Sequence, residues 1–410
     1  MKIAIIGDLQ FGGGKYDEVA EQMSRVAGLA PDLAVSMGDA AGPRIHTRYG
    51  LEDTKKLMDL LCCPYTALLG NHDVEFQPGH AAEYDPIAAY REIFDCEPWS
   101  ALEVCGTLLL FISVEPQNAD EMRTVNGVMV SERQFLWVKE QLRAHPGMPT
   151  LIFSHAPAAG NGMRCSPPLH SAATDTYLDQ TADALRWRTL QREFPQIKVW
   201  FSAHYHMGHD YDSAITEKEG VIHISCGVLA PCSRDNTRHT RFADLTDDNR
   251  LIISTFDHDA PEKGLTEDAV IDLTDGAKTR GRIAHPTEHE MPIGFEEVLG
   301  VMYLASSDRY YISTSGGRLW EYLPELAEYA GTIVFEDVCT ELRADTQRLY
   351  VNTRSGGIFS VELDSADRFE RLGSFTPPKR RAEDEMHGEA LPSVRFETRT
   401  SKEGLYVRFG

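Results

Sequence analysis

The stretch IAIIGDLQFGG, residues 3–13, reads as a buried strand that ends in a loop bearing a carboxylate. Four apolar residues lead into Gly7, and Asp8 and Gln10 follow. Strands of a parallel sheet that is covered on both faces are near-continuous apolar runs of this kind. A histidine two residues after Asp8 would complete a familiar metal-ligand pair, but glutamine stands there. The stretch therefore predicts a buried strand of an α/β protein and leaves open whether its end binds a metal ion.

Four later apolar runs also end in side chains that can bind metal ions. These runs are DLAVSMGDA at 32–40, YTALLGNHD at 65–73, PTLIFSHAP at 149–157 and IKVWFSAHYH at 197–206. Loops at the carboxyl ends of strands build the binding site of open α/β folds. Across the five runs, the metal-capable side chains are Asp8, Gln10, Asp39, Asn71, His155, His204 and His206, with His72 beside Asn71. Five strand ends of this type predict one shared metal site.

Helical patterns separate several of these runs. Residues 15–29 carry Val19, Met23 and Val26 at spacings of three and four, and residues 53–61 read as a second helix. Residues 131–144 begin with a serine that can cap a helix. Further apolar runs, GTLLLFISVE, GVIHISCGV and RLIISTFDHD, read as additional strands. The first two thirds of the chain are therefore predicted to be α/β, with strands buried on both faces.

Composition is that of a soluble globular protein with an acidic surface. The chain has 410 residues, and 40 Lys and Arg against 63 Asp and Glu give a net charge of −23. This charge opposes binding to long nucleic acid or an anionic membrane, and no apolar run approaches the roughly 18 residues of a membrane span. The N-terminal apolar run is too short for a signal peptide, and the eight cysteines are scattered. We therefore expect reduced thiols and a cytoplasmic location.

The composition of the sequence changes near residue 259. Residues 259–295 are polar and charged, and we expect a linker or an extended excursion there. This segment would separate an α/β domain at 1–258 from a second domain at 296–410.

The second domain is predicted to be small and rich in β-strands. The segments YYISTSGGRLWEY at 310–322 and LYVNTRSGGIFSVEL at 349–363 each hold a Gly-Gly pair between β-rich runs, which predicts hairpins. Tyr311 and Tyr350 lie 39 residues apart, close to the spacing of propeller blades. The final GLYVRFG resembles a partial third copy, but so few copies cannot close a propeller. We expect either a small β domain or strands completed by a partner chain; the second alternative predicts a homo-oligomer through this domain.

The series Gly-Asp, Gly-Asp, Gly-Asn-His-Asp, His and His-x-His resembles the motifs of the calcineurin-like metallophosphoesterases and spans residues 2–257. The resemblance implies two packed mixed β-sheets flanked by helices, an αββα sandwich, with a dinuclear metal site between the carboxyl ends of the strands. It also implies two divalent or trivalent metal ions, and attack of a metal-bound hydroxide on a phosphate ester. Imidazole and carboxylate ligands suit Mn, Fe or Zn.

The resemblance assigns a role to each motif residue. Asp8 and His206 would bind the first metal, Asp39 would bridge both metals, and Asn71, His155 and His204 would bind the second. His72 would stabilise charge or donate a proton at the leaving-group oxygen, so His72 and Asp39 are the predicted catalytic residues.

Gln10 stands where most members of the family have a histidine that binds the first metal. Its amide oxygen can coordinate a metal, as a neutral and weaker donor than imidazole. The residues Asp8-Leu9-Gln10-Phe11-Gly12 are similar to the D-P-Q-F-G motif of a cytosolic eukaryotic branch of protein serine/threonine phosphatases. We therefore predict that Gln10 is a metal ligand in a D-x-Q variant of the first motif.

Three further residues are predicted to contact the substrate. Arg44 and Arg164 lie in loops that follow site strands and can hold a phosphate. His209 lies three residues past His206.

Three hypotheses on function follow from these residues. A phosphomonoesterase acting on a phosphorylated small molecule or protein comes first, and a phosphodiesterase acting on cyclic nucleotides or related diesters comes second. The motifs do not separate the two, because a monoester and a diester differ by one substituent on the phosphate. The third hypothesis is a catalytically weak binding protein, and only Gln10 supports it.

Overall fold

The computed structural model describes most of the chain and divides it into two compact units. The first unit comprises Met1–Cys165 and Thr174–Pro286, and the second contains all strands from β14 on. The described residues are 1–41, 47–74, 85–116, 127–158, 161, 163, 177–179, 185–211, 213–230, 237–285, 298–304, 309–314, 317–323, 328–334, 339–344, 348–354, 356–362, 369–374, 399–401 and 404–406.

The first sheet of the first unit has seven strands in the order β13-β12-β11-β10-β1-β2-β3. Its strands are β1 (Lys2–Ile6), β2 (Leu33–Ser36), β3 (Tyr65–Ala67), β10 (His239–Leu245), β11 (Arg250–Asp257), β12 (Leu265–Asp272) and β13 (Arg280–Gly281). The strands β1, β2 and β3 are parallel, whereas β10 to β13 are joined in antiparallel fashion. Three carboxyl ends therefore meet at one edge of this sheet.

The second sheet has six strands in the order β4-β5-β6-β7-β9-β8. Its strands are β4 (Ser100–Val104), β5 (Thr107–Ile112), β6 (Thr150–Ser154), β7 (Ile197–Ser202), β8 (Ile215–Lys218) and β9 (Val221–Ser225). The central strands β5, β6, β7 and β9 are parallel, and an antiparallel strand lies at each edge. Both sheets are thus mixed.

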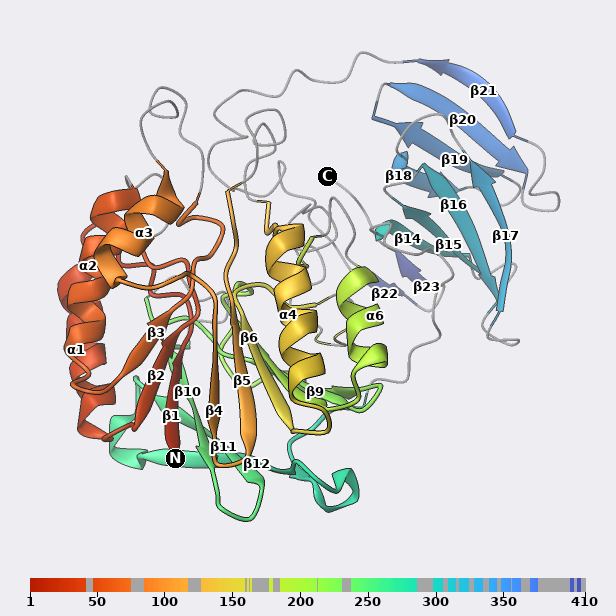
Figure 1. Cartoon of the computed structure of the whole chain (residues 1–410). Coiled ribbons are helices and arrows are strands. Elements are labelled where there is room, and N and C mark those ends of the chain that lie inside the picture. Colours follow the sequence, from red (N-terminus) through yellow and green to blue (C-terminus); the bar gives the residue numbers. More distant parts are fainter. Residues whose placement is uncertain are drawn as a thin grey trace. The chain divides into compact units, whose positions relative to one another are not determined.

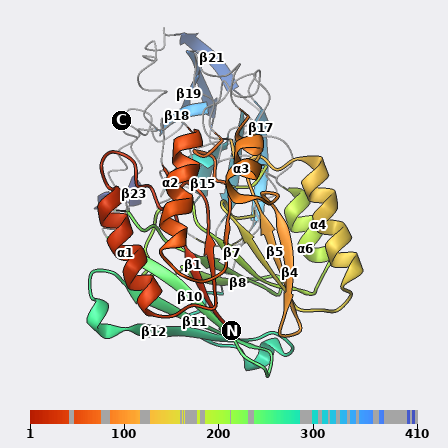
Figure 2. The same ribbon diagram turned by 60° about the vertical axis from the view of Figure 1, so that its left-hand side comes forward.

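Helices cover the outer faces of the two sheets, which gives an αββα sandwich (Figures 1 and 2). The helices are α1 (Tyr16–Gly28), α2 (Thr47–Asp59), α3 (Pro86–Phe94), α4 (Glu132–Ala144) and α6 (Leu185–Glu193). On the seven-stranded sheet, Met23 of α1 and Leu57 of α2 pack with Ile6. On the six-stranded sheet, Leu142 of α4 and Trp187 of α6 pack in one cluster with the sheet's outer side chains. Among the described helices, none is long and apolar enough to cross a membrane.

Strand β1 shows why the sequence is apolar without alternation. Ile3 and Ile5 face the second sheet and join the core between the sheets, whereas Ala4 and Ile6 face the helices. Both faces of the strand are buried from Ile3 to Ile6, so each of these four positions is apolar. The core between the sheets also contains stacked aromatic rings, with 4.8 Å between the ring centroids of Phe153 and Phe201.

The predicted helices are present, with shifts of at most two residues at their ends except for α2, which begins six residues earlier than predicted. Residues 15–29 form α1, residues 131–144 form α4, and residues 53–61 overlap α2. Ser131 caps α4 as predicted, because its hydroxyl accepts a hydrogen bond from the Gln134 N–H at 3.1 Å. Such a cap satisfies one of the unpaired N–H groups in the first turn of a helix.

The segment 259–295 contains strands of the seven-stranded sheet, where we expected a linker or an extended excursion. Strand β12 pairs along its length with β11, and β13 pairs with β12. Asp268, Ala269, Val270 and Ile271 are buried, while Thr266 and Glu267 near the start of β12 are exposed. The apolar part of this strand is too short to stand out from its charged surroundings in the sequence.

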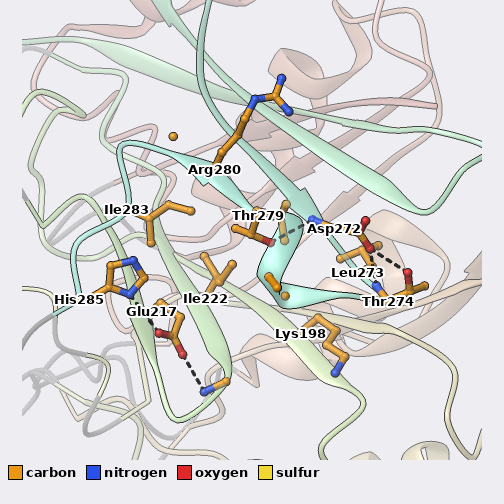
Figure 3. A pocket seen from close by; sticks show the side chains of 15 residues that line it. Lys198, Glu217, Ile222, Asp272, Leu273, Thr274, Thr279, Arg280, Ile283 and His285 are labelled. Atoms are coloured by element: carbon orange, nitrogen blue, oxygen red, sulfur yellow. Dashed lines mark hydrogen bonds and ion pairs between the residues drawn. The ribbon is translucent and has the colours of Figure 1, made fainter.

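A cavity of about 470 Å³ lies where the end of β12 meets the starts of β7 and β9 (Figure 3). Ile222, Leu273 and Ile283 form part of its apolar lining, and Glu217 binds His285 at 3.0 Å on one side. None of the residues predicted for the metal site lines it. The cavity lies at the opposite end of β7 from His204.

The second unit contains two four-stranded antiparallel sheets that repeat one pattern. The first comprises β14 (Val298–Leu304), β15 (Arg309–Thr314), β16 (Arg318–Leu323) and β17 (Glu328–Val334), and the second comprises β18 (Cys339–Ala344), β19 (Arg348–Thr353), β20 (Gly357–Glu362) and β21 (Phe369–Ser374). Gly317 and Gly356 form matching hairpin turns with positive φ angles of 73° and 93°. The predicted hairpins and the β-rich second unit are therefore present. Of the segment 404–410 that resembles a partial third copy, Gly404–Tyr406 form β23, which pairs with β22 (Arg399–Ser401) just before it.

The buried side chain of His223 on β9 allows us to predict how the folding stability changes at acidic pH. It is 1% exposed, and its Nδ1 has no hydrogen-bond partner among the described residues. Burial lowers the pKa of His223 from 6.5 to about 3. Below pH 6.5 the unfolded chain therefore takes up a proton that the folded protein excludes, so stability falls as the pH falls from 6.5 toward 3.

We expect His223→Leu to reduce the loss of unfolding free energy between pH 7 and pH 5 by about 2 kcal/mol. Urea unfolding of the wild type and the variant at both pH values measures this difference. Equal losses in the two proteins would show that His223 is protonated in the folded state.

Candidate metal centre

The side chains that sequence motifs predict as ligands come together at the carboxyl ends of the parallel strands. Asp8, Asp39 and Asn71 follow β1, β2 and β3, while His155 follows β6 directly and His204 follows β7. Their ligand atoms form two groups in which all atoms lie within 4.8 Å of one another. One group is Asp39, His155 and His204, and the other is Asp8, Asp39 and His206. Asp39 belongs to both groups, as a bridging ligand would.

The first group surrounds the Nε2 atom of His155, which is fully buried. His155 Nε2 lies 3.0 Å from Asn71 Oδ1, 3.1 Å from His204 Nδ1 and 3.3 Å from Asp39 Oδ2. The other ring nitrogen, Nδ1, lies 2.9 Å from the Met37 carbonyl oxygen and donates to it. A backbone carbonyl in this place fixes the tautomer of a metal-binding histidine, with its lone pair on Nε2.

This tautomer leaves acceptor atoms facing one another. The Nε2 lone pair meets a carboxylate oxygen and an amide oxygen, and neither of these can donate a hydrogen bond. Such an arrangement is repulsive unless a proton or a metal ion lies among the atoms. Without metal, Nε2 can hold a proton, because against the effect of burial Asp39 and Asp8 raise the pKa of His155, and a metal ion can take the place of that proton. The first group therefore fits a metal ion.

The second group contains a buried oxygen that accepts no hydrogen bond. Asp8 is fully buried, and its Oδ1 lies 3.5 Å from His155 Nδ1 but has no hydrogen-bond partner among the described residues. Its Oδ2 accepts from the His204 N–H at 3.0 Å and lies 3.7 Å from His206 Nε2. A buried charge is costly unless it is paired or binds a metal. The Asp8 carboxylate therefore also fits a metal ligand.

The pKa values indicate a shortage of positive charge around these carboxylates. Burial raises the pKa of Asp8 to about 7, against the attraction of His155. Burial also opposes ionisation of Asp39, but His155 and His72 outweigh it and hold the pKa of Asp39 below its ordinary value. For His155, burial lowers the pKa, yet Asp39 and Asp8 raise it to about 9. The His155 imidazole thus interacts with more than one carboxylate, and bound cations would supply the positive charge that these carboxylates lack.

The backbone at the site is held in an unusual conformation. The φ angles of Gln10, Asp39, His204 and His206 are 44°, 50°, 68° and 50°, in the left-handed region. Non-glycine residues there cost about 1–3 kcal/mol each and persist where surrounding structure fixes them. Four of the predicted ligands share this strain, which is typical of functional sites.

Gln10 reaches the centre from the β1 end. Its side chain is 7% exposed, and its Nε2 lies 3.5 Å from Asp39 Oδ2. The Gln10 N–H also donates to the Asp39 carbonyl oxygen at 3.1 Å. The amide group therefore lies beside the shared carboxylate, and direct coordination by Gln10 stays a prediction.

Asp73 is a residue whose role the sequence did not reveal. It is 5% exposed, and its carboxylate accepts from the N–H groups of Asp39, Ala40 and Gly70 at 2.7, 3.1 and 2.8 Å. In return, the Asp39 carboxylate accepts from the His72 N–H at 2.9 Å. These bonds tie the loop after β2 to the loop after β3 and fix the backbone of Asp39. The motif Gly-Asn-His-Asp contained this residue, but nothing in its spacing pointed to the loop after β2.

Of the other predicted site residues, the two histidines lie in the described part of the chain and the two arginines do not. His72 Nε2 lies 3.9 Å from Asp39 Oδ2, and its side chain is 18% exposed. His209 is 2% exposed, and its Nδ1 lies 2.9 Å from Thr255 Oγ1. Arg44 and Arg164 lie outside the described residues. The substrate contacts predicted for His209 and the two arginines stay predictions.

Comparison with known proteins agrees with this geometry. A model of the calcineurin-like phosphoesterases matches residues 1–208, and the chain belongs to this family. The chain matches no curated protein.

Two solved structures are similar to the chain at low sequence identity. One is a dimetal phosphatase from Danio rerio, 16% identical, covering 69% of this chain and 96% of that chain with a TM-score of 0.44. The other is the protein TT1561 of Thermus thermophilus, 10% identical, covering 68% of this chain and 98% of that chain with a TM-score of 0.35.

A substitution at Gly70 tests the importance of the packing around Asp39. A Cβ at Gly70 would lie 2.2 Å from Asp39 Oδ1 and 2.6 Å from Asp39 N, so alanine must displace the shared carboxylate. We expect Gly70→Ala to weaken Mn²⁺ binding by at least about tenfold. Titration of metal-free protein with Mn²⁺ measures this effect.

Gly28 provides the matched control, because a Cβ there meets nothing within 4 Å at the end of α1. Gly28→Ala should leave Mn²⁺ binding unchanged. Equal binding by both variants would mean that the position of Asp39 does not control the metal centre.

Proposed function

We propose that this protein is a phosphoesterase that depends on two metal ions and hydrolyses phosphomonoesters. The observation that carries the proposal is the pair of buried ligand groups that share Asp39. When bound, two metal ions supply a nucleophile from water near neutral pH and neutralise charge on the reacting phosphate. The donors are carboxylate, imidazole and amide groups, which suit Mn, Fe or Zn.

Side chains of this protein would bind the metal ions and act on the bound substrate. Asp39, His155, His204 and Asn71 would hold one ion, and Asp8, Asp39, His206 and Gln10 the other. His72 is partly exposed beside Asp39, so its imidazole can reach both the centre and a bound substrate. We assign to His72 the donation of a proton to the leaving-group oxygen, a typical role of histidine.

The net charge of −23 also bears on the substrate. A strongly acidic surface repels long nucleic acid, whereas the local cationic centre would attract a compact phosphate group. We therefore propose a phosphorylated small molecule or protein as the substrate. A cytoplasmic location and a homo-oligomer through the second unit stay predictions.

Hydrolysis of aryl phosphates tests the proposal. Metal-loaded protein should hydrolyse an aryl phosphate monoester faster than the matching diester. Faster hydrolysis of the diester would favour a phosphodiesterase acting on cyclic nucleotides or related diesters. Failure on both esters and on a panel of nucleotides and phosphopeptides would instead favour a binding protein without turnover.

Asp39→Asn should abolish turnover and lower metal content, because it removes the negative charge shared by both ligand groups. We expect the Mn²⁺ content to fall at both positions and the rate to fall more than about 100-fold. Asp248→Asn is the control, since Asp248 is an exposed carboxylate paired with Arg250 at 2.7 Å. Near-normal turnover by Asp39→Asn would remove Asp39 from the bridging role.

Gln10→His should strengthen binding of the metal held by Asp8 and His206. Imidazole is a stronger ligand than a neutral amide for these metals, so we expect Mn²⁺ affinity to rise about tenfold. Isothermal titration of metal-free protein measures the change. An unchanged affinity would show that the side chain of Gln10 does not coordinate a metal.

A further inference from the structure

The loop after β7 carries two predicted ligands in a strained conformation. His204 and His206 have φ angles of 68° and 50°, and non-glycine residues keep such angles only where their surroundings fix them. The start of the loop is fixed by two bonds, from Ala203 N to His155 O and from His204 N to Asp8 Oδ2. Its far end must be fixed by other contacts.

His209 fixes the far end of this loop through both its backbone and its side chain. Its N–H donates to His239 Nδ1 at 2.8 Å, and its ring Nδ1 lies 2.9 Å from Thr255 Oγ1. The Thr255 hydroxyl donates its one proton to Asp268 Oδ2 at 2.5 Å and accepts from Arg241 Nη1 at 2.9 Å. The His209 Nδ1 must therefore be the donor to Thr255.

The groups behind Thr255 are charged and buried. Arg241 is fully buried and binds Asp268 Oδ2 at 2.7 Å, while Asp268 is 8% exposed. Arg282 joins the same cluster, 3.5 Å from Asp268 Oδ1, and donates to the carbonyl oxygens of His209 and Asp210 at 3.4 and 3.2 Å. A buried ion pair is weak evidence for stability, because desolvation offsets much of its attraction. This ion pair contacts Thr255, which in turn binds His209, and its position therefore indicates that it orients the His209 imidazole.

His209 also supports the Asp8 strand end. A Cβ on Gly227 would lie 2.9 Å from His209 Nε2, so the ring packs directly against the Gly227 backbone. A Cβ on Gly7 would lie 2.0 Å from the Gly227 carbonyl oxygen, so the Gly7 and Gly227 backbones pack closely as well. The Leu229 N–H donates to the Asp8 carbonyl oxygen at 2.8 Å. One face of His209 thus supports the segment beside Asp8, and its backbone holds the loop of His206.

We propose that His209 is a positioning residue for the ligands Asp8 and His206, and that Thr255, Asp268 and Arg241 hold its imidazole in place. The proposal rests on the metal centre of the proposed function. All four residues lie beyond residues 1–208, the span that matches the family model. Strands β10, β11 and β12 would therefore set the geometry of a centre whose ligands all precede them.

Titration of the metal-free full chain with Mn²⁺ tests this role. We expect His209→Ala and Thr255→Val to weaken binding of at least one ion by about 10–100-fold, the usual effect of losing a group that orients a ligand. His209→Asn keeps a donor at the position of Nδ1, and Thr255→Ser keeps the hydroxyl. Both conservative variants should bind Mn²⁺ within about threefold of the wild type.

His258 provides the matched control for a buried histidine. It lies directly after β11 and is 2% exposed, and its Nε2 lies 2.8 Å from Oγ1 of Thr240 on β10. His258→Ala should lower the melting temperature but leave Mn²⁺ affinity unchanged. If His209→Ala does not fold, as judged by near-ultraviolet circular dichroism, the pair Thr255→Val and Thr255→Ser decides the question.

Three results would overturn the proposal. They are an unchanged affinity in His209→Ala or Thr255→Val, an equal loss in the conservative variants, and an equal loss in His258→Ala. Because the readout is metal binding, weakened binding together with no ester hydrolysis by the wild type would support this role of His209 and contradict the proposed function.

Discussion

The carboxylate of Asp39 is the group on which the metal centre depends. It belongs to both ligand groups, lies 3.3 Å from His155 Nε2, and is 1% exposed. Its Oδ1 accepts from the His72 N–H, while its Oδ2 faces His155 Nε2, whose other ring nitrogen donates to the Met37 carbonyl oxygen. A buried site with converging acceptors requires a proton or a metal ion among them, and the two ligand groups that share Asp39 fit a pair of metal ions.

The fold is arranged to hold this carboxylate in a strained place. Parallel strands in two sheets bring the predicted ligands to one end of the sandwich, and Asp73 ties the backbone of Asp39 to the loop after β3. Glycines allow the close approach, because side chains at Gly70 and Gly7 would overlap the atoms around Asp39 and Gly227. On the far side, the buried cluster of Arg241, Thr255 and Asp268 holds His209 against Gly227. Contacts with both sheets thus stabilise the strained, left-handed backbone of the ligand loops.

Much of this arrangement could be predicted from the sequence, because its signals are local. Apolar runs that end in Asp8, Asp39 or His155 are visible as short patterns, and Ser131 marks the start of α4. The parts that escaped prediction depend on contacts between distant segments. Asp268 lies 59 residues after His209 and meets it through Thr255, so no periodicity links them. Strand β12 escaped because its buried run is short and its exposed residues are charged, which led to the expectation of a linker at 259–295.

The most direct test of the dinuclear centre is anomalous diffraction from a crystal of the metal-loaded protein. The account predicts two metal peaks about 3.5–4 Å apart, with the Asp39 carboxylate between them, Asp8 and His206 at one peak, and His155 and His204 at the other. A single peak, or two peaks that Asp39 does not bridge, would contradict it.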